Sequence, residues 1–120
     1  MDNNSILQSV KKMLGIAETY THFDSDLIMH INTIFSVLTQ LGVGPKDGFR
    51  IEDESAEWTD FLSEKDLQVL EAIKSYMYLR VRLLFDPPQS GIVTEAINKQ
   101  LSEFEWRLNV AAEEAKEVTT

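Results

Sequence analysis

The 120-residue chain contains no cysteine. Disulfide bonds and thiolate metal sites are therefore excluded, and a reducing compartment is the natural home of such a protein. The N-terminal residues are not basic and lead into no apolar segment, so we expect no secretory signal. No apolar run approaches the roughly 20 residues that cross a bilayer. We expect a soluble protein that stays where it is made and does not contact a membrane.

Basic residues are also scarce. Eleven Lys and Arg face 20 Asp and Glu, which gives a net charge of −9. The surface of such a chain taken as a whole does not bind phosphate backbones. It can still surround nucleic acid without binding it, or contact a basic protein surface. Acidity that serves solubility alone is the plainer interpretation. With 43% hydrophobic residues, the length suits one domain with a single core.

The N-terminal third of the chain predicts two amphipathic helices. Ser5 and Gly15 suit the N-cap and the C′ position of a short first helix. Asp24 and Asp26 offer N-cap oxygens and negative charge at the start of a second helix, which ends at Gly42. The apolar residues of the second helix recur at spacings of four and three: Leu27, Ile31, Ile34, Leu38 and Leu41.

Residues 42–56 contain three glycines and a proline, so we expect an irregular loop. Within it, Phe49-Arg50-Ile51 could form one arm of a short hairpin. Residues 52–66 carry seven acids and one lysine, a net charge of −6. We expect this acidic stretch to be exposed, with one helical turn near Trp58 to Leu62.

Ser63 is expected to cap a longer helix that runs to Phe85, with Asp66 at N3 as in a capping box. Two apolar stripes follow this helix. One consists of Leu67, Leu70, Met77, Val81 and Leu84, and the other of Val69, Ile73, Tyr76 and Leu83. Because a helix that is apolar on two faces needs two partners, this one is either the centre of a bundle or shared with another subunit.

The sequence Asp86-Pro87-Pro88 ends that helix firmly, since a proline disfavours helical geometry in the residue before it. A last helix starts near Ile92, and its apolar residues are Val93, Ile97, Leu101, Phe104, Leu108 and Ala111. A rigid elbow therefore joins two long helices that fold back on each other. We expect the acidic residues 113–120 to fray. The predicted fold is all-α, a single domain (1–120) with four to five helices and one irregular loop.

The chemistry-bearing residues argue against an enzyme. His22, Asp24, Asp26 and His30 are of the types that bind zinc, manganese or iron. Because the two aspartates lie where N-cap residues belong, we favour capping, and we expect neither a metal nor a cofactor. The glycines of the loop follow a helix rather than a strand, unlike those of a phosphate loop. No Ser/His/Asp pattern is visible.

Two arginines interrupt the apolar end of the long helix. Arg80 and Arg82 could pack their stems and reach solvent with their heads. They could equally pair with another chain or seat an acidic partner. Trp106 lies off the main stripe of the last helix beside Arg107, and we interpret it as an interface anchor, since Trp and Arg are enriched at hot spots. Phe85, at the helix end, joins these as a candidate subunit or partner contact.

Five segments occur in order between about Ser5 and Leu108. They are ILQSVKKMLGI, INTIFSVLTQLGVGP, EWTDFL, YLRVRLLFDPP and EFEWRL. The most specific are Leu84-Phe85-Asp86-Pro87-Pro88 and Glu105-Trp106-Arg107-Leu108. Together they resemble the small head-tail connector proteins of tailed bacteriophages, also called adaptor or head-completion proteins. The source could be a phage or a prophage.

The resemblance implies a mostly helical structural protein of the virion without catalytic activity. About twelve copies would form a homo-oligomeric ring beneath the portal protein, with head-to-tail contacts between subunits. The ring would extend the channel for double-stranded DNA and offer a surface to the next neck or tail protein. Before assembly the chain would lie in the host cytoplasm. Residues 111–120 could order on docking to the portal.

Within this interpretation, the Asp86-Pro87-Pro88 elbow would set the angle between the long helices and so the curvature of a ring. Lys46 and Arg50 could make weak phosphate contacts in the channel. Two other hypotheses remain. A monomeric acidic protein could mimic DNA and inhibit a host DNA-binding protein, and a small metal enzyme could use His22 and His30.

Overall fold

The computed structural model describes residues 4–62 and 67–119 of the chain. Five helices lie within these residues: α1 (Ile6–Leu14), α2 (Asp24–Gln40), α3 (Trp58–Phe61), α4 (Leu67–Phe85) and α5 (Gly91–Thr119). Over the same residues the structure contains no strand, and the one β-type contact is an isolated bridge between Ser5 and Glu57. The prediction of a small all-α bundle is confirmed.

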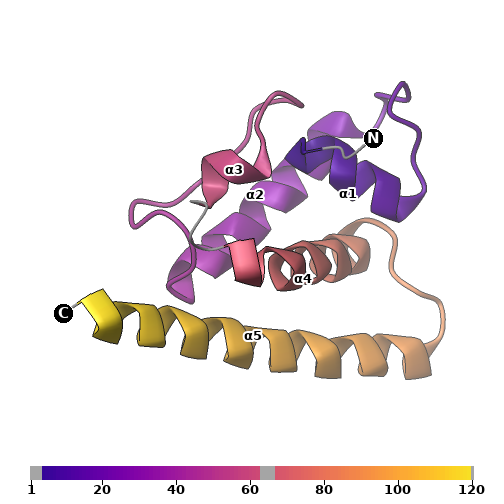
Figure 1. Ribbon diagram of the computed structural model, residues 1–120. Coiled ribbons are helices and arrows are strands. Elements are labelled where there is room, and N and C mark those ends of the chain that lie inside the picture. The colour runs from indigo at the N-terminus through magenta and orange to yellow at the C-terminus, as the bar shows by residue number, and fades with distance from the viewer. Residues whose placement is uncertain (1–3, 63–66, 120) are drawn as a thin grey trace.

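Helix α4 is the centre of this bundle. It contacts α1, α2 and α5, and Figure 1 shows α5 along one edge of the molecule with α4 between it and the other helices. The side chains of Ile73, Tyr76, Met77 and Val81 are fully buried. Except at Leu84, which is 50% exposed, the two apolar faces of α4 therefore pack within the chain, which is the first of the two alternatives that the sequence left open.

The ends of α1 follow the sequence prediction. The hydroxyl of Ser5 accepts a hydrogen bond from the backbone N–H of Gln8 at 3.3 Å. Gly15 follows the helix in the left-handed conformation, with φ of 81°, and its N–H bonds to carbonyls of the last turn. Residues with a Cβ rarely adopt this conformation, so glycine suits the position.

The start of α2 departs from the prediction. Its N-cap residue is Phe23, and no side chain caps the helix. Asp24 and Asp26 lie in the first turn, where their charges complement the helix dipole, but the expected capping role is wrong. The reason is a competing partner, since an oxygen of the Asp24 carboxylate lies 2.9 Å from Nζ of Lys11.

The loop after α2 contains no hairpin. Ile51 is buried, and its backbone needs partners that a single extended residue cannot find in a sheet. The amide of Asn32 on α2 supplies both. Its Nδ2 donates to the Ile51 carbonyl at 3.0 Å, and its Oδ1 accepts from the Ile51 N–H at 2.7 Å. One side chain thus replaces the strand that the sequence suggested.

The other predicted helix boundaries agree with the structure in some places and differ in others. The helical turn expected near Trp58 is confirmed as α3, with the indole buried and donating to Ser9 Oγ at 2.9 Å. The capping box expected at Ser63 and Asp66 lies outside the described residues. Helix α5 continues to Thr119, so the backbone beyond residue 113 is helical up to that point where the sequence predicted fraying.

Candidate functional site

The proline elbow is a short turn between two antiparallel helices. Helix α4 ends at Phe85, where the Asp86 N–H still donates to the Arg82 carbonyl at 2.8 Å. Helix α5 begins at Gly91, and the Ser90 carbonyl accepts from the Thr94 N–H at 3.1 Å. The two helices lie side by side, as Figure 1 shows. The predicted fold-back is confirmed.

Phe85 packs inward at the elbow. Its ring meets that of Phe23 edge to face, with 5.1 Å between the centroids. Such aromatic pairs contribute about 1 kcal/mol beyond the area they bury. This contact ties the end of α4 to the segment before α2, so Phe85 serves the subunit itself. Its contact with a partner remains a prediction.

Arg80 joins α4 to α5 through a network of hydrogen bonds with Tyr76 and Glu105. Its Nη2 lies 2.7 Å from Oε2 of Glu105, and the Tyr76 hydroxyl donates to the same oxygen at 2.6 Å. Nε of Arg80 also donates to the Tyr76 hydroxyl at 3.1 Å. The arginine therefore has an acidic partner in its own chain. This geometry favours an intramolecular role over the pairing with another chain.

The place of Tyr76 in this hydrogen-bond network predicts that the fold loses stability in strong base. Burial, and then the hydrogen bond to Glu105, raise the pKa of Tyr76 from its ordinary 10.0 to about 12. Because the folded pKa is higher than the unfolded one, the neutral hydroxyl stabilises the fold fully below pH 10. That contribution is lost as the pH rises through 12. In urea titrations between pH 9 and 12, the free energy of unfolding should fall more steeply for the wild type than for Tyr76→Phe. Parallel curves would contradict this.

Arg82 differs from Arg80. Its Nη1 lies 3.4 Å from the hydroxyl of Tyr78, one turn earlier on α4. Among the described residues it forms no ion pair. A half-buried guanidinium without a carboxylate is available to an acidic group from outside. Its role at a partner contact remains a prediction.

Trp106 lies on the outer face of α5, with 68% of its surface exposed. Leu101 and Leu108, on the opposite face, are buried against the bundle. Arg107 is exposed and pairs with Glu103 one turn earlier. An exposed tryptophan next to an arginine is typical of a contact surface. The structure brings these two residues together, but it does not bring them near the elbow.

Lys46 and Arg50 are exposed on the loop after α2. Arg50 lines a shallow groove between this loop and α2, together with Asp47 and Met29. The exposed acids Glu52, Asp53 and Glu54 follow directly in sequence. The two basic side chains therefore stand beside negative charge. Contact between them and DNA remains a prediction.

The histidines have no metal-site geometry around them. Across the described residues, no group of three histidine, cysteine or acidic side chains could hold a metal ion. The ring of His22 packs edge to face on Phe23 with 4.8 Å between centroids. Asp24 pairs with Lys11 instead of turning toward His22 or His30.

Lys11 is the residue that sequence reasoning missed. It is fully buried, pairs with Asp24 and donates from Nζ to the Glu18 carbonyl at 3.0 Å. A signal was present, because Leu7, Lys11 and Leu14 recur at spacings of four and three on one helix face. A lysine on an apolar stripe predicts either snorkelling or a buried partner.

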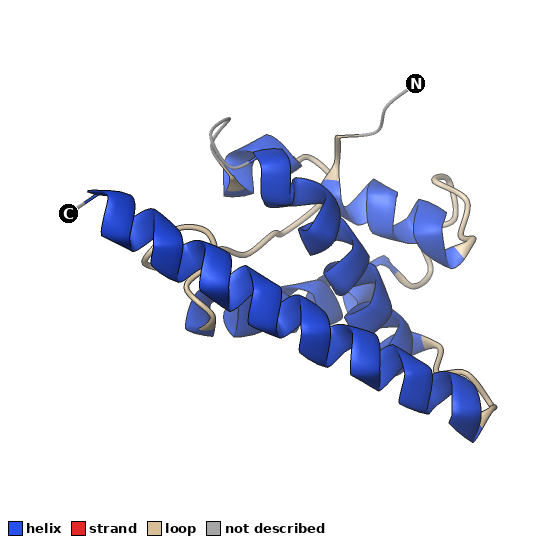
Figure 2. Cartoon of the chain, turned by 60° about the horizontal axis from the view of Figure 1, so that its bottom comes forward, coloured by secondary structure: helices blue, strands red, loops and turns tan. Residues whose placement is uncertain are grey.

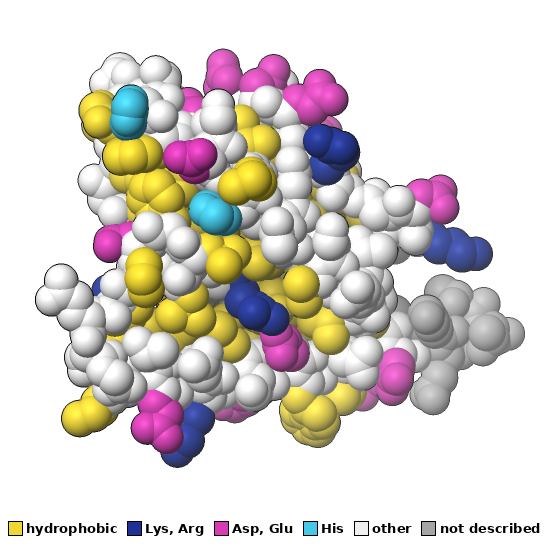
Figure 3. All heavy atoms as spheres, turned by 180° about the vertical axis from the view of Figure 1, so that it is seen from behind, with side chains coloured by type: hydrophobic (Ala, Val, Ile, Leu, Met, Phe, Trp, Pro, Cys, Tyr) yellow, Lys and Arg dark blue, Asp and Glu magenta, His cyan; other side chains and the backbone are white. Residues whose placement is uncertain are grey.

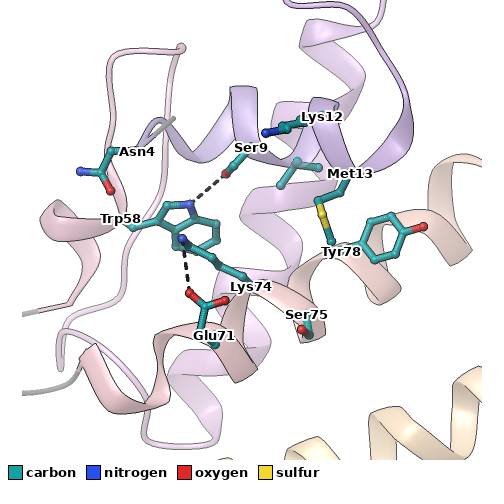
Figure 4. A pocket seen from close by; sticks show the side chains of 10 residues that line it. Asn4, Ser9, Lys12, Met13, Trp58, Glu71, Lys74, Ser75 and Tyr78 are labelled. Carbon is teal, nitrogen blue, oxygen red and sulfur yellow. Dashed lines mark hydrogen bonds and ion pairs between the residues drawn. The ribbon is translucent and has the colours of Figure 1, made fainter. Parts of the chain in front are cut away.

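A second missed feature is a pocket of about 470 Å³ between α1, α3 and α4. The indole of Trp58 forms its inner wall (Figure 4). Lys12 and Lys74 stand at its rim, and Nζ of Lys74 lies 6.0 Å from the centre of the indole ring. The residues come from three separate segments, so no local motif could have revealed the pocket.

Comparison with known proteins gives a family. The model of a family described as phage connector protein matches residues 6–115. No curated protein and no solved structure matches the chain. The matched range starts with α1 and ends within α5, so it spans the whole bundle. This confirms the resemblance to phage head-tail connectors, and the chain belongs to the phage connector protein family.

Proposed function

We propose that the chain forms a ring beneath the portal protein in the neck of a tailed phage and prepares the surface for the next neck or tail protein. The observation that carries this proposal is the family match over residues 6–115. Membership supports a head-tail connector role in general, which is structural rather than catalytic. It also implies contacts with portal and tail proteins in the virion. The ring, its copy number near twelve and its docking details belong to the proposal.

The distribution of exposed apolar residues supports a ring. Subunits that contact each other head to tail need two different surfaces. Met29 on α2 is 59% exposed, and Trp106 on α5 is 68% exposed. These residues lie on different helices, and α4 lies between most of α5 and the other helices. Only toward its C-terminal half does α5 reach the end of α2, where the Asn109 amide donates to the Leu41 carbonyl at 3.1 Å. One subunit therefore offers distinct surfaces to two neighbours, with Arg82 and Arg107 as candidate polar contacts.

The elbow would set the angle between α4 and α5 and with it the curvature of the ring. We expect the Pro87→Ala/Pro88→Ala variant to assemble poorly on the portal while its helix content by circular dichroism changes little, because alanine frees the backbone of the turn. The matched control is Pro45→Ala, which changes a proline in the loop after α2. Normal assembly of the double variant would contradict the role of the elbow.

The charge of the chain suits a channel through which DNA slides. A net charge of −9 repels the phosphate backbone, and Lys46 and Arg50 would supply a few weak contacts. DNA would pass without sequence-specific binding.

No helix of the described residues is long and apolar enough to span a membrane. We propose the virion neck as the final location and the host cytoplasm as the location before assembly.

The alternative of a DNA mimic requires acidic groups spread over much of the surface. Figure 3 shows one face on which hydrophobic and uncharged side chains cover most of the area and acidic groups stand mainly toward its edges. The exposed acids of the loop, such as Glu52, Asp53 and Glu54, are close together in sequence. This distribution disfavours the mimic.

A binding assay separates the two functions. The purified chain should be captured by the portal protein encoded in the same gene cluster, and it should not be captured by a basic DNA-binding enzyme of the host. Portal binding should persist at moderate salt, since apolar contacts are less screened than charges. Capture by the basic enzyme alone would overturn the connector proposal in favour of the inhibitor.

A further inference from the structure

We propose that two copies of the free chain pair through the outer faces of their α5 helices, in antiparallel orientation. A second stripe follows this helix, opposite to the one that faces the bundle. Its members recur at alternating spacings of four and three: Ile92, Ala96, Lys99, Glu103, Trp106 and Val110. This spacing is the a/d repeat of a helix that packs along another helix.

The structure leaves this stripe uncovered from Ile92 to Trp106, and its last member, Val110, is half-buried. Ile92 is 82% exposed and Trp106 is 68% exposed, while Ala96 and Lys99 are also open to solvent. Figure 2 shows α5 crossing the front of the molecule with no other element over it. The stripe from residue 92 to residue 110 is about 27 Å long at 1.5 Å per residue. A straight helix from a second copy could lie along its whole length.

The order of residues makes the stripe complementary to itself. When two copies run antiparallel about a two-fold axis near residue 101, Lys99 lies opposite Glu103 of the partner subunit. The small Ala96 then lies opposite Trp106 of the partner subunit. Ile92 lies opposite Val110 of the partner subunit. Each layer occurs twice, so charge meets opposite charge and the largest side chain meets the smallest.

Other arrangements lose this match. In a parallel pair, Lys99 would face its own copy and Glu103 would do the same, which places like charges in contact. An antiparallel pair shifted by seven residues would set Lys99 against a valine and Glu103 against a tryptophan. Lys99 would then lose its partner across the pair, and Glu103 would keep only Arg107 of its own helix. A polar layer within an apolar stripe selects one register at some cost in affinity.

The pair would be a closed state of the free chain. A two-fold contact uses the same surface on both copies and cannot extend into a ring. It would cover Trp106 until the chain meets its template. The pairing itself does not depend on the proposed function, because it concerns the purified chain alone.

Charge exchange tests the register. In analytical ultracentrifugation at low salt, the wild type should associate reversibly to twice the monomer mass. Lys99→Glu and Glu103→Lys should each weaken association about tenfold or more, since each places like charges opposite one another twice. The Lys99→Glu/Glu103→Lys double variant should recover to within about threefold of the wild type, because the opposite charges are restored. Circular dichroism would check that all variants remain helical.

The absence of cysteine allows a direct test of orientation. Gln100 lies beside the two-fold axis, so Gln100→Cys should crosslink to its own copy with a short bismaleimide. The exposed Glu113 lies near the other end of α5, and Glu113→Cys should not crosslink. The proposal would be overturned if the wild type stayed monomeric, or if the single charge changes left its association intact. A double variant that associates no better than the single variants, or equal crosslinking at both positions, would overturn it as well.

Discussion

Replacing Asp24 with alanine is expected to lower the free energy of unfolding by about 3 kcal/mol. Lys11 is fully buried, and the Asp24 carboxylate 2.9 Å from its Nζ is the opposite charge that it meets. Without that carboxylate the ammonium keeps the Glu18 carbonyl as its partner, and a buried charge with so little compensation is costly. We place the loss at the lower end for buried pairs because 23% of the Asp24 side chain is exposed. Urea denaturation followed by circular dichroism would measure it.

Two comparisons isolate the ion pair. Asp26→Ala removes an acid from the same helical turn that forms no ion pair with any other described residue, and it should cost no more than about 1 kcal/mol through the helix dipole. Lys11→Met/Asp24→Ala removes both charges and should be more stable than Asp24→Ala, because no buried charge is left without a partner. Equal losses for the two aspartate variants would show that the pair does not hold α1 to α2.

The second large effect is expected at Gly44, where alanine should cost about 3 kcal/mol. Its φ is +88°, and a Cβ there would collide with the Phe61 ring, lying 2.7 Å from Cζ. That ring cannot easily move, since it is buried and packs on Phe35 and Phe49 with centroids 4.7 and 5.3 Å away. The collision therefore adds to the cost of a left-handed backbone. Thermal and urea unfolding would both report the loss.

Gly15 supplies the matched control. Its φ of +81° is nearly the same, but a Cβ there meets no atom within 4 Å. Gly15→Ala should therefore cost about 1 kcal/mol, from backbone strain alone. The difference between the two variants measures the packing of the loop after α2 on the aromatic cluster. If both variants lost the same amount, Phe61 would have to be free to move aside.

Periodicity predicted most of the architecture, because the helices bury their faces at regular spacings. The stripe from Leu27 to Leu38 on α2 is buried as expected, and Gly15 ends α1. The double stripe of α4 correctly indicated a helix with partners on two sides. The sequence predictions failed where a polar group could choose between several hydrogen-bond or ion-pair partners. Asp24 pairs with Lys11 from another helix instead of capping its own, and Asn32 replaces the strand expected near Ile51.

The sequence could only partly predict which candidate contact residues are exposed and which pair within the chain. Arg80 and Arg82 are two positions apart in the same apolar stretch, and the sequence does not distinguish them. In the structure Arg80 meets Glu105 on α5, whereas Arg82 meets no carboxylate among the described residues. Which arginine finds an acid depends on how α5 returns along α4, a long-range feature with no local signal. Trp106 was different. Its exposure follows from its place opposite the buried stripe of a single helix, and the structure agrees.

The most direct test of the connector role is electron microscopy of the portal protein of the same gene cluster, imaged alone and after incubation with the chain. We expect an additional ring of density beneath the portal, coaxial with its channel and absent when the Pro87→Ala/Pro88→Ala variant is used. A portal that keeps its original outline at saturating amounts of the wild-type chain would contradict the connector role.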